Sequence, residues 1–116
     1  MKPEADGGLS TLEYHVLLAM ADGPRYGYAV KGAIEVESDG ALMPRAASLY
    51  RVLARLMGWG LVREAAARGE SDPHPGRERK YYALTTSGRT TLGAEARRLK
   101  AVAALAERRL RTAASR

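Results

Sequence analysis

Polar side chains recur at helical spacing between residues 48 and 55. Ser48, Arg51 and Arg55 stand at positions i, i+3 and i+7, so an α-helix would present them on one face. An arginine can donate two hydrogen bonds to a guanine edge or bind a phosphate, and a serine hydroxyl can contact several bases. This face could therefore read DNA in a major groove. Because these residue types are common, it could equally be an ordinary solvated surface.

The apolar residues of the same segment predict the helix that carries this face. They predict a helix over residues 46–57 whose buried stripe consists of Leu49, Val52, Leu53 and Leu56. Tyr50 lies at one flank of the stripe. Its hydroxyl could reach a phosphate, or its ring could pack at the edge of the core.

Two further helices are predicted upstream of this segment. Ser10 and Glu13 have the spacing of a capping box, which predicts a helix over about residues 12–21. A second helix is predicted over about residues 27–38, and Pro44 disfavours helix just before the third one. Two short helices followed by a third with a basic outer face are typical of a helix-turn-helix.

Two strands are predicted directly after the third helix, over residues 61–66 and 77–84. They would form a hairpin, so the fold class is mainly α with a small β-hairpin, a winged helix-turn-helix. Three cations gather on the second strand: Arg77, Arg79 and Lys80. They could contact the DNA backbone or a minor groove, or they could protect an edge strand from aggregation.

A long last helix is predicted over about residues 86–112, with Thr85 as its N-cap. It carries an apolar seam spaced four and three residues apart: Leu92, Ala96, Leu99, Ala103, Ala106 and Leu110. A second copy of the chain would cover this seam and produce a two-fold homodimer, and we expect Leu17 of the first helix to assist. The alternative is that the helix folds back on its own domain.

Composition narrows the class of protein. The chain has 116 residues, enough for one domain, and no cysteine, so we expect neither disulfides nor thiolate metal sites. Residues 1–76 have a net charge of −2 and residues 77–116 a net charge of +8, which favours a polyanionic partner. No catalytic motif or membrane-spanning segment is recognisable, so we expect a cytoplasmic protein that is not an enzyme and holds no metal or cofactor.

Three segments resemble the PadR family of transcriptional regulators. They are LSTLEYHVLLAMADGPRYGYAV, SLYRVLARLMGWGLV and RERKYYALTTSG, which together cover roughly residues 9–92. The resemblance implies a winged-helix domain, a dimer through the C-terminal helix and, usually, repression of nearby genes. A single last helix is similar to the short form of the family.

The resemblance also suggests individual contacts. Tyr50 and the basic positions of the third helix match the family's DNA-contacting helix, and Arg79 and Lys80 match its wing. Tyr26 and Tyr28 match the start of the second helix, where a phosphate contact is expected. The segment before the third helix departs from the family pattern, and there Arg45 is an additional phosphate candidate.

We therefore expect a disordered lead over residues 1–8, a winged-helix DNA-binding domain over 9–85 and a dimerisation helix over 86–116. The expected partner is double-stranded DNA, bound by a homodimer at a pseudo-palindromic operator. A winged helix that binds protein or RNA is the alternative. Some relatives bind flat aromatic drugs between aromatic side chains, but the last helix here has none. A small-molecule effector stays unidentified.

Overall fold

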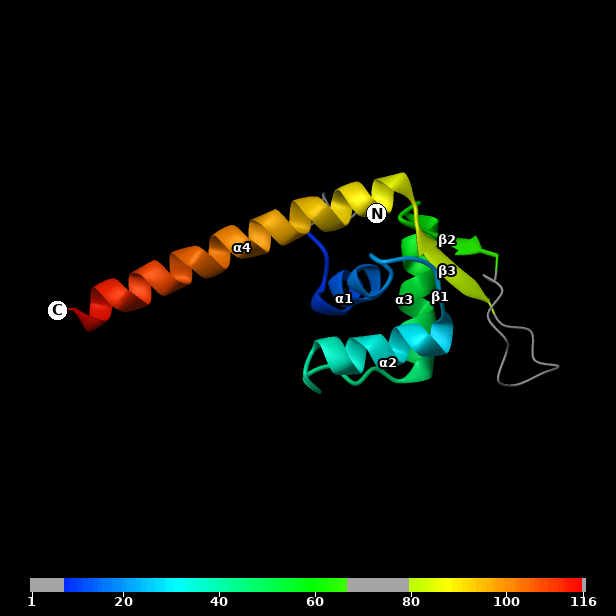
Figure 1. The fold of residues 1–116 in the computed structure, drawn as a ribbon, viewed down its shortest axis with the longest axis horizontal. Coiled ribbons are helices and arrows are strands. Elements are labelled where there is room, and N and C mark those ends of the chain that lie inside the picture. Colours follow the sequence, from blue (N-terminus) through cyan, green and yellow to red (C-terminus); the bar gives the residue numbers. More distant parts are fainter. Residues whose placement is uncertain (1–7, 67–79, 116) are drawn as a thin grey trace.

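The computed structural model describes residues 8–66 and 80–115. Within these ranges the elements follow the order α1 (Thr11–Ala19), β1 (Arg25–Tyr26), α2 (Gly27–Glu37), α3 (Ala46–Gly58), β2 (Val62–Ala65), β3 (Tyr81–Leu84) and α4 (Thr86–Ala114). Helices α1 to α3 and the sheet form one body, and α4 passes over α1 and extends far beyond it (Figure 1). The order of helices and hairpin strands confirms the predicted fold class.

Local capping explains where two of the helices begin. The Ser10 hydroxyl accepts the Glu13 N–H at 3.1 Å, and the Glu13 carboxylate accepts the Ser10 N–H at 2.8 Å, which confirms the capping box. The Thr85 hydroxyl caps α4 by accepting the Gly88 N–H at 2.9 Å. Helix α1 ends at Ala19, two residues earlier than predicted, because the chain tightens into a turn there.

The sheet has three antiparallel strands in the order β1-β3-β2. Val62 pairs with Leu84 in the predicted hairpin, and Arg25 pairs with Tyr82 on the other edge of β3. Strand β1 was not predicted, because two residues are too few to show alternation. Strand β3 begins at Tyr81 rather than at residue 77, and residues 77–79 lie outside the described part of the chain.

The core joins one face of each of the first three helices to the sheet. Its largest fully buried side chains are Leu17, Met20, Ile34, Leu49, Leu53, Leu56, Val16 and Val30. All four predicted stripe residues of α3 are buried. Trp59 is half-buried and packs against this core.

Leu17 corrects one expectation. It was expected to assist a dimer interface, but it is 0% exposed within the protomer's own core. Because the spacing of α1 is apolar on several sides, its sequence does not show which leucine faces inward. Leu17 is therefore a core residue of the protomer.

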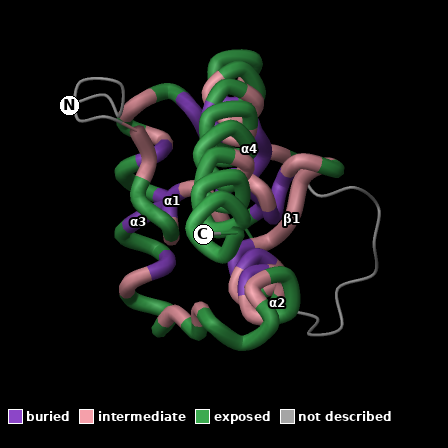
Figure 2. The backbone as a smooth tube through the Cα atoms, turned by 90° about the vertical axis from the view of Figure 1, so that its left-hand side faces the viewer, coloured by how far each residue is buried: buried purple, intermediate pink, exposed green. Residues whose placement is uncertain are grey.

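One face of helix α4 is buried near the start of the helix and exposed further along. Near its start, Gly88 and Glu95 are buried and Leu92 packs against the core. Further along the same face Leu99 is 38% exposed and Leu110 is 71% exposed. Viewed from its C-terminal end, α4 projects from the body with this half exposed (Figure 2). Folding back therefore accounts for only the first half of the helix.

Among the described residues, none of the helices combines the length and the apolar character needed to span a membrane.

Candidate nucleic-acid interface

The outer face of α3 is open to solvent and carries few polar groups. Arg51 is exposed, and its guanidinium lies 3.4 Å from the Ser48 hydroxyl one turn away. Ala47 and Ala54 are exposed on the same side of the helix. The opposite side of α3 is buried in the core, so this face points toward solvent. Arg51 is a long cationic side chain on it.

Arg55 is differently placed from Arg51, although both stand on the outer side of α3. Its Nη1 atom donates to Glu13 Oε2 at 2.6 Å, which joins α3 to α1. The Arg55 side chain is still 47% exposed, whereas that of Glu13 is 6% exposed. The structure thus separates the two arginines that spacing alone had treated as equivalent. The spacing of Glu13 from Ser10 had predicted only its capping role.

Tyr50 lies against the beginning of α2. A Cβ atom added at Gly27 would be 2.5 Å from the Tyr50 hydroxyl, so the absence of a side chain at Gly27 admits the tyrosine ring. Tyr28 in the first turn of α2 is exposed, and Tyr26 is half-buried with its ring 5.8 Å from that of Tyr81. The structure therefore brings Tyr26, Tyr28 and Tyr50 together around the N-terminus of α2, where backbone N–H groups favour anions.

Burial raises the pKa of Tyr82 above its ordinary value, and the neighbouring Tyr50 acts in the same direction. Tyr82 is buried on β3 in the centre of the sheet. A tyrosine hydroxyl is already protonated at neutral pH, and the raised pKa of Tyr82 keeps its hydroxyl a hydrogen-bond donor at more alkaline pH as well.

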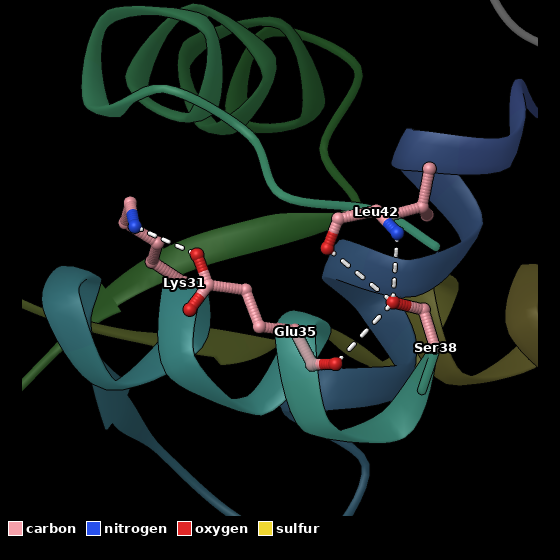
Figure 3. A network of polar contacts seen from close by, with 4 residues as sticks. All are labelled: Lys31, Glu35, Ser38 and Leu42. Carbon is pink, nitrogen blue, oxygen red and sulfur yellow. Dashed lines mark hydrogen bonds and ion pairs between the residues drawn. The ribbon is translucent and has the colours of Figure 1, made fainter. Parts of the chain in front are cut away.

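The turn between α2 and α3 is organised by Ser38, as Figure 3 shows. Its hydroxyl accepts the Leu42 N–H at 2.9 Å and lies 3.3 Å from the Leu42 carbonyl oxygen and 3.5 Å from that of Glu35. Lys31 and Glu35 form an ion pair of 2.7 Å on the adjoining turn of α2. The hydrogen bonds of Ser38 hold the turn that leads toward Arg45, which is exposed and stands at the N-cap of α3.

The described part of the wing carries two exposed cations. Lys80 Nζ lies 3.6 Å from Glu64 Oε1 across the hairpin, and both side chains are more than half exposed. Arg63 on β2 is also exposed and was not among the predicted site residues. Its alternation with buried Val62 was the signal that could have identified it. The predicted contacts Arg77 and Arg79 lie outside the described residues.

The predicted dimer seam is largely uncovered in the protomer. Leu92 and Ala96 are half-buried, whereas the members beyond them are exposed: Leu99, Ala103, Ala106 and Leu110. Val102 and Leu105 are also exposed on this half of α4. Residues 1–7 of the predicted lead lie outside the described residues, while Gly8 is described and lies against Glu95.

Comparison of the sequence with known protein families identifies the family of this chain. Residues 16–94 match the Transcriptional regulator PadR-like family, a span that includes the end of α1, helices α2 and α3, the sheet and the start of α4. The chain belongs to this family. The family resemblance noted in the sequence is thereby confirmed.

Solved structures of other members share the fold. A PadR family transcription regulator from Clostridium difficile R20291 is 20% identical and aligns over 87% of this chain and 99% of its own, with a TM-score of 0.69. A PadR-like transcription factor from Bacteroides fragilis is 28% identical over 84% of this chain and 87% of its own, with a TM-score of 0.65. Bacillus subtilis PadR in complex with operator DNA is 23% identical over 73% of this chain and 46% of its own, with a TM-score of 0.60.

A curated relative is closer in sequence but much longer. The chain is 43% identical over 81 residues to an uncharacterized 37.1 kDa protein in transposon TN4556 of Streptomyces fradiae. The match covers 70% of this chain and 21% of that protein, so this PadR-like chain spans about a fifth of the length of its curated relative.

Proposed function

We propose that this PadR-like protein binds double-stranded DNA as a homodimer and represses transcription from a pseudo-palindromic operator. The observation that carries the proposal is the outer face of α3, which is held outward by a buried stripe and presents Arg51. A helix of this kind fits a major groove, and arginine is well suited to guanine. The complex of Bacillus subtilis PadR with operator DNA supports the proposal by analogy.

The supporting contacts in this proposal are phosphate contacts around α3. Tyr50, Tyr28 and Tyr26 supply hydroxyls at the start of α2, and Arg45 supplies a cation at the start of α3. The predicted wing cations Arg77, Arg79 and Lys80 add charge on the other side. Such contacts position a protein on the duplex, while contacts to base edges determine the sequence that is bound.

The homodimer in this proposal forms through the exposed half of α4. Its seam continues beyond the protomer's own body, so a second copy can cover Leu99, Ala103, Ala106 and Leu110 without unfolding anything. Two-fold pairing would present two α3 helices, which matches the symmetry of a palindromic site. We propose no effector, since nothing about the described residues selects one.

The proposal is tested by selecting a duplex of about 30 base pairs from a random library with the purified chain, then measuring its affinity against salt. We expect a marked preference for the selected duplex over a scrambled one. The logarithm of the binding constant should fall with the logarithm of the salt concentration by about 0.9 per phosphate neutralised. Flat salt dependence, or equal binding of both duplexes, would contradict the proposal. Tighter binding of single-stranded RNA would favour the RNA-binding alternative.

Arg51→Ala should weaken binding of the selected duplex by about 1–3 kcal/mol, or roughly 5- to 150-fold, because a base-reading contact is lost. Fluorescence anisotropy measures this change. Arg97→Ala is a matched control, since it removes the same charge from an exposed position on α4. Equal affinities for the Arg51 variant and the parent would show that Arg51 does not read the operator.

A further inference from the structure

Two charged side chains are buried among the described residues, and each is held by an arginine. Glu13 on α1 is 5% exposed and Glu95 on α4 is 7% exposed. Arg55 binds Glu13 at 2.6 Å, and Arg98 binds Glu95 through two contacts of 2.7 and 3.0 Å. A buried carboxylate without a partner is costly, so these contacts constrain the elements that carry them.

The two carboxylates also bind adjacent backbone amides. Glu13 accepts the Ser10 N–H at 2.8 Å, and Glu95 accepts the Leu9 N–H at 3.1 Å. Gly8 completes this contact, because a Cβ atom there would be 2.8 Å from Glu95 Oε2. The segment Leu9–Ser10 is therefore held between a side chain of α1 and a side chain of α4. Arg98, together with the Leu9 N–H, lowers the pKa of Glu95 against the opposing effect of burial.

These contacts form one continuous path from α4 to α3. It runs from Arg98 and Glu95 through Leu9–Ser10 to Glu13 and then to Arg55, which is 42 positions away from Glu13 in sequence. Arg55 Nη1 points along this path toward α1. The guanidinium thus connects two helices in the free protein, whereas Arg51 on the same helix has no comparable carboxylate contact in the described structure.

We infer that Glu13 is a positioning residue for DNA reading, which acts through Arg55 to set the orientation of α3 against α1 and α4. The inference rests on the proposed function. In a homodimer joined by α4, the separation and angle of the two α3 helices depend on how each α3 is held relative to its α4. Dimers that read two half-sites need a defined separation of those sites. Arg55 contributes by holding α3 in place, and base reading falls to Arg51.

A double-mutant cycle separates positioning from direct contact. Glu13→Gln and Arg55→Met should each lower affinity for the selected duplex by about tenfold, and the double variant should bind no more weakly than either one. If Arg55 contacted DNA independently of Glu13, Arg55→Met would weaken binding and Glu13→Gln would not. That result, or losses that multiply in the double variant, would overturn the inference.

A second readout distinguishes positioning from stability. The parent should discriminate among duplexes whose half-sites are moved one base pair closer or further apart, and the variants should discriminate less. A variant that is merely less stable would bind all spacings with the same proportional loss. Glu35→Gln is the matched control, because the same substitution breaks a half-buried ion pair with Lys31 that lies within α2 and does not connect α3 to another helix. It should keep the parent's spacing preference.

The outcomes also separate this inference from the proposed function. Arg55→Met breaks the pair from its exposed side, so it serves as the test even if circular dichroism shows that Glu13→Gln does not fold. Parent-like spacing preference in Arg55→Met would overturn the inference and leave the proposed function standing. A parent chain that prefers no duplex would overturn both.

Discussion

Gly88→Ala is expected to lower the free energy of unfolding by about 3 kcal/mol, at the upper end of what overpacking costs. A Cβ atom at this position would be 2.0 Å from the Leu61 carbonyl oxygen. That oxygen belongs to the backbone and accepts the Thr85 N–H at 3.1 Å, so it cannot move aside without breaking a hydrogen bond. Thermal unfolding should show a midpoint lowered by roughly 10 °C or more.

A loss of stability in Gly88→Ala would be informative, because helix propensity alone predicts a gain in the free energy of unfolding. Alanine is favoured over glycine inside a helix by about 1 kcal/mol. Gly93 on the same helix is the matched control, since the nearest atom to an added Cβ there is Arg97 Nη1 at 3.5 Å. Gly93→Ala should therefore raise the midpoint slightly. A raised midpoint in both variants would contradict the close packing of α4 on the chain at Leu61.

Leu99→Glu is expected to dissociate the proposed homodimer. Leu99 lies where the apolar face of α4 leaves the protomer's own body, and it is 38% exposed there. Covering it with a second copy would bury a carboxylate without a partner, at a cost on the order of 3 kcal/mol or more, which corresponds to dimerisation weakened by more than about 100-fold. Sedimentation velocity should show the parent as a dimer and the variant as a monomer.

Ala101→Glu is the control for this experiment. It places the same charge on an exposed position nearly opposite the seam, so the dimer should persist. Loss of the dimer in Leu99→Glu should also sharply weaken binding of a duplex with two half-sites, because each protomer then contacts only one of them. An unchanged sedimentation coefficient in Leu99→Glu would contradict the assignment of this face to the dimer.

Local patterns were sufficient for the parts of the fold that depend on neighbours in sequence. The stripe of α3 was predicted residue by residue, because the helical repeat alone decides which side chains share a face. The caps at Ser10 and Thr85 were predictable for the same reason, since their bonds span three residues. The order of these elements then predicted a winged helix, and the family resemblance implied the same fold.

The candidate site was only partly predictable from the same patterns. Spacing placed Arg51 and Arg55 on one outer face, and both are indeed exposed there. It could not distinguish them, because the partner that engages Arg55 stands 42 residues earlier on another helix. Leu17 was misplaced for a related reason: the periodicity of a helix that is apolar on several sides does not indicate which side faces the core.

The sequence by itself therefore determined the element types, their caps, the buried stripe of α3 and the family. Tertiary structure alone decided the addition of β1 to the sheet, the burial of Glu13 and Glu95, and the role of Arg55. The physical reason is the range of the interactions. Helical repeats and caps act within one or two turns, whereas a buried carboxylate is tolerated only where the fold brings a distant cation and backbone amides to it.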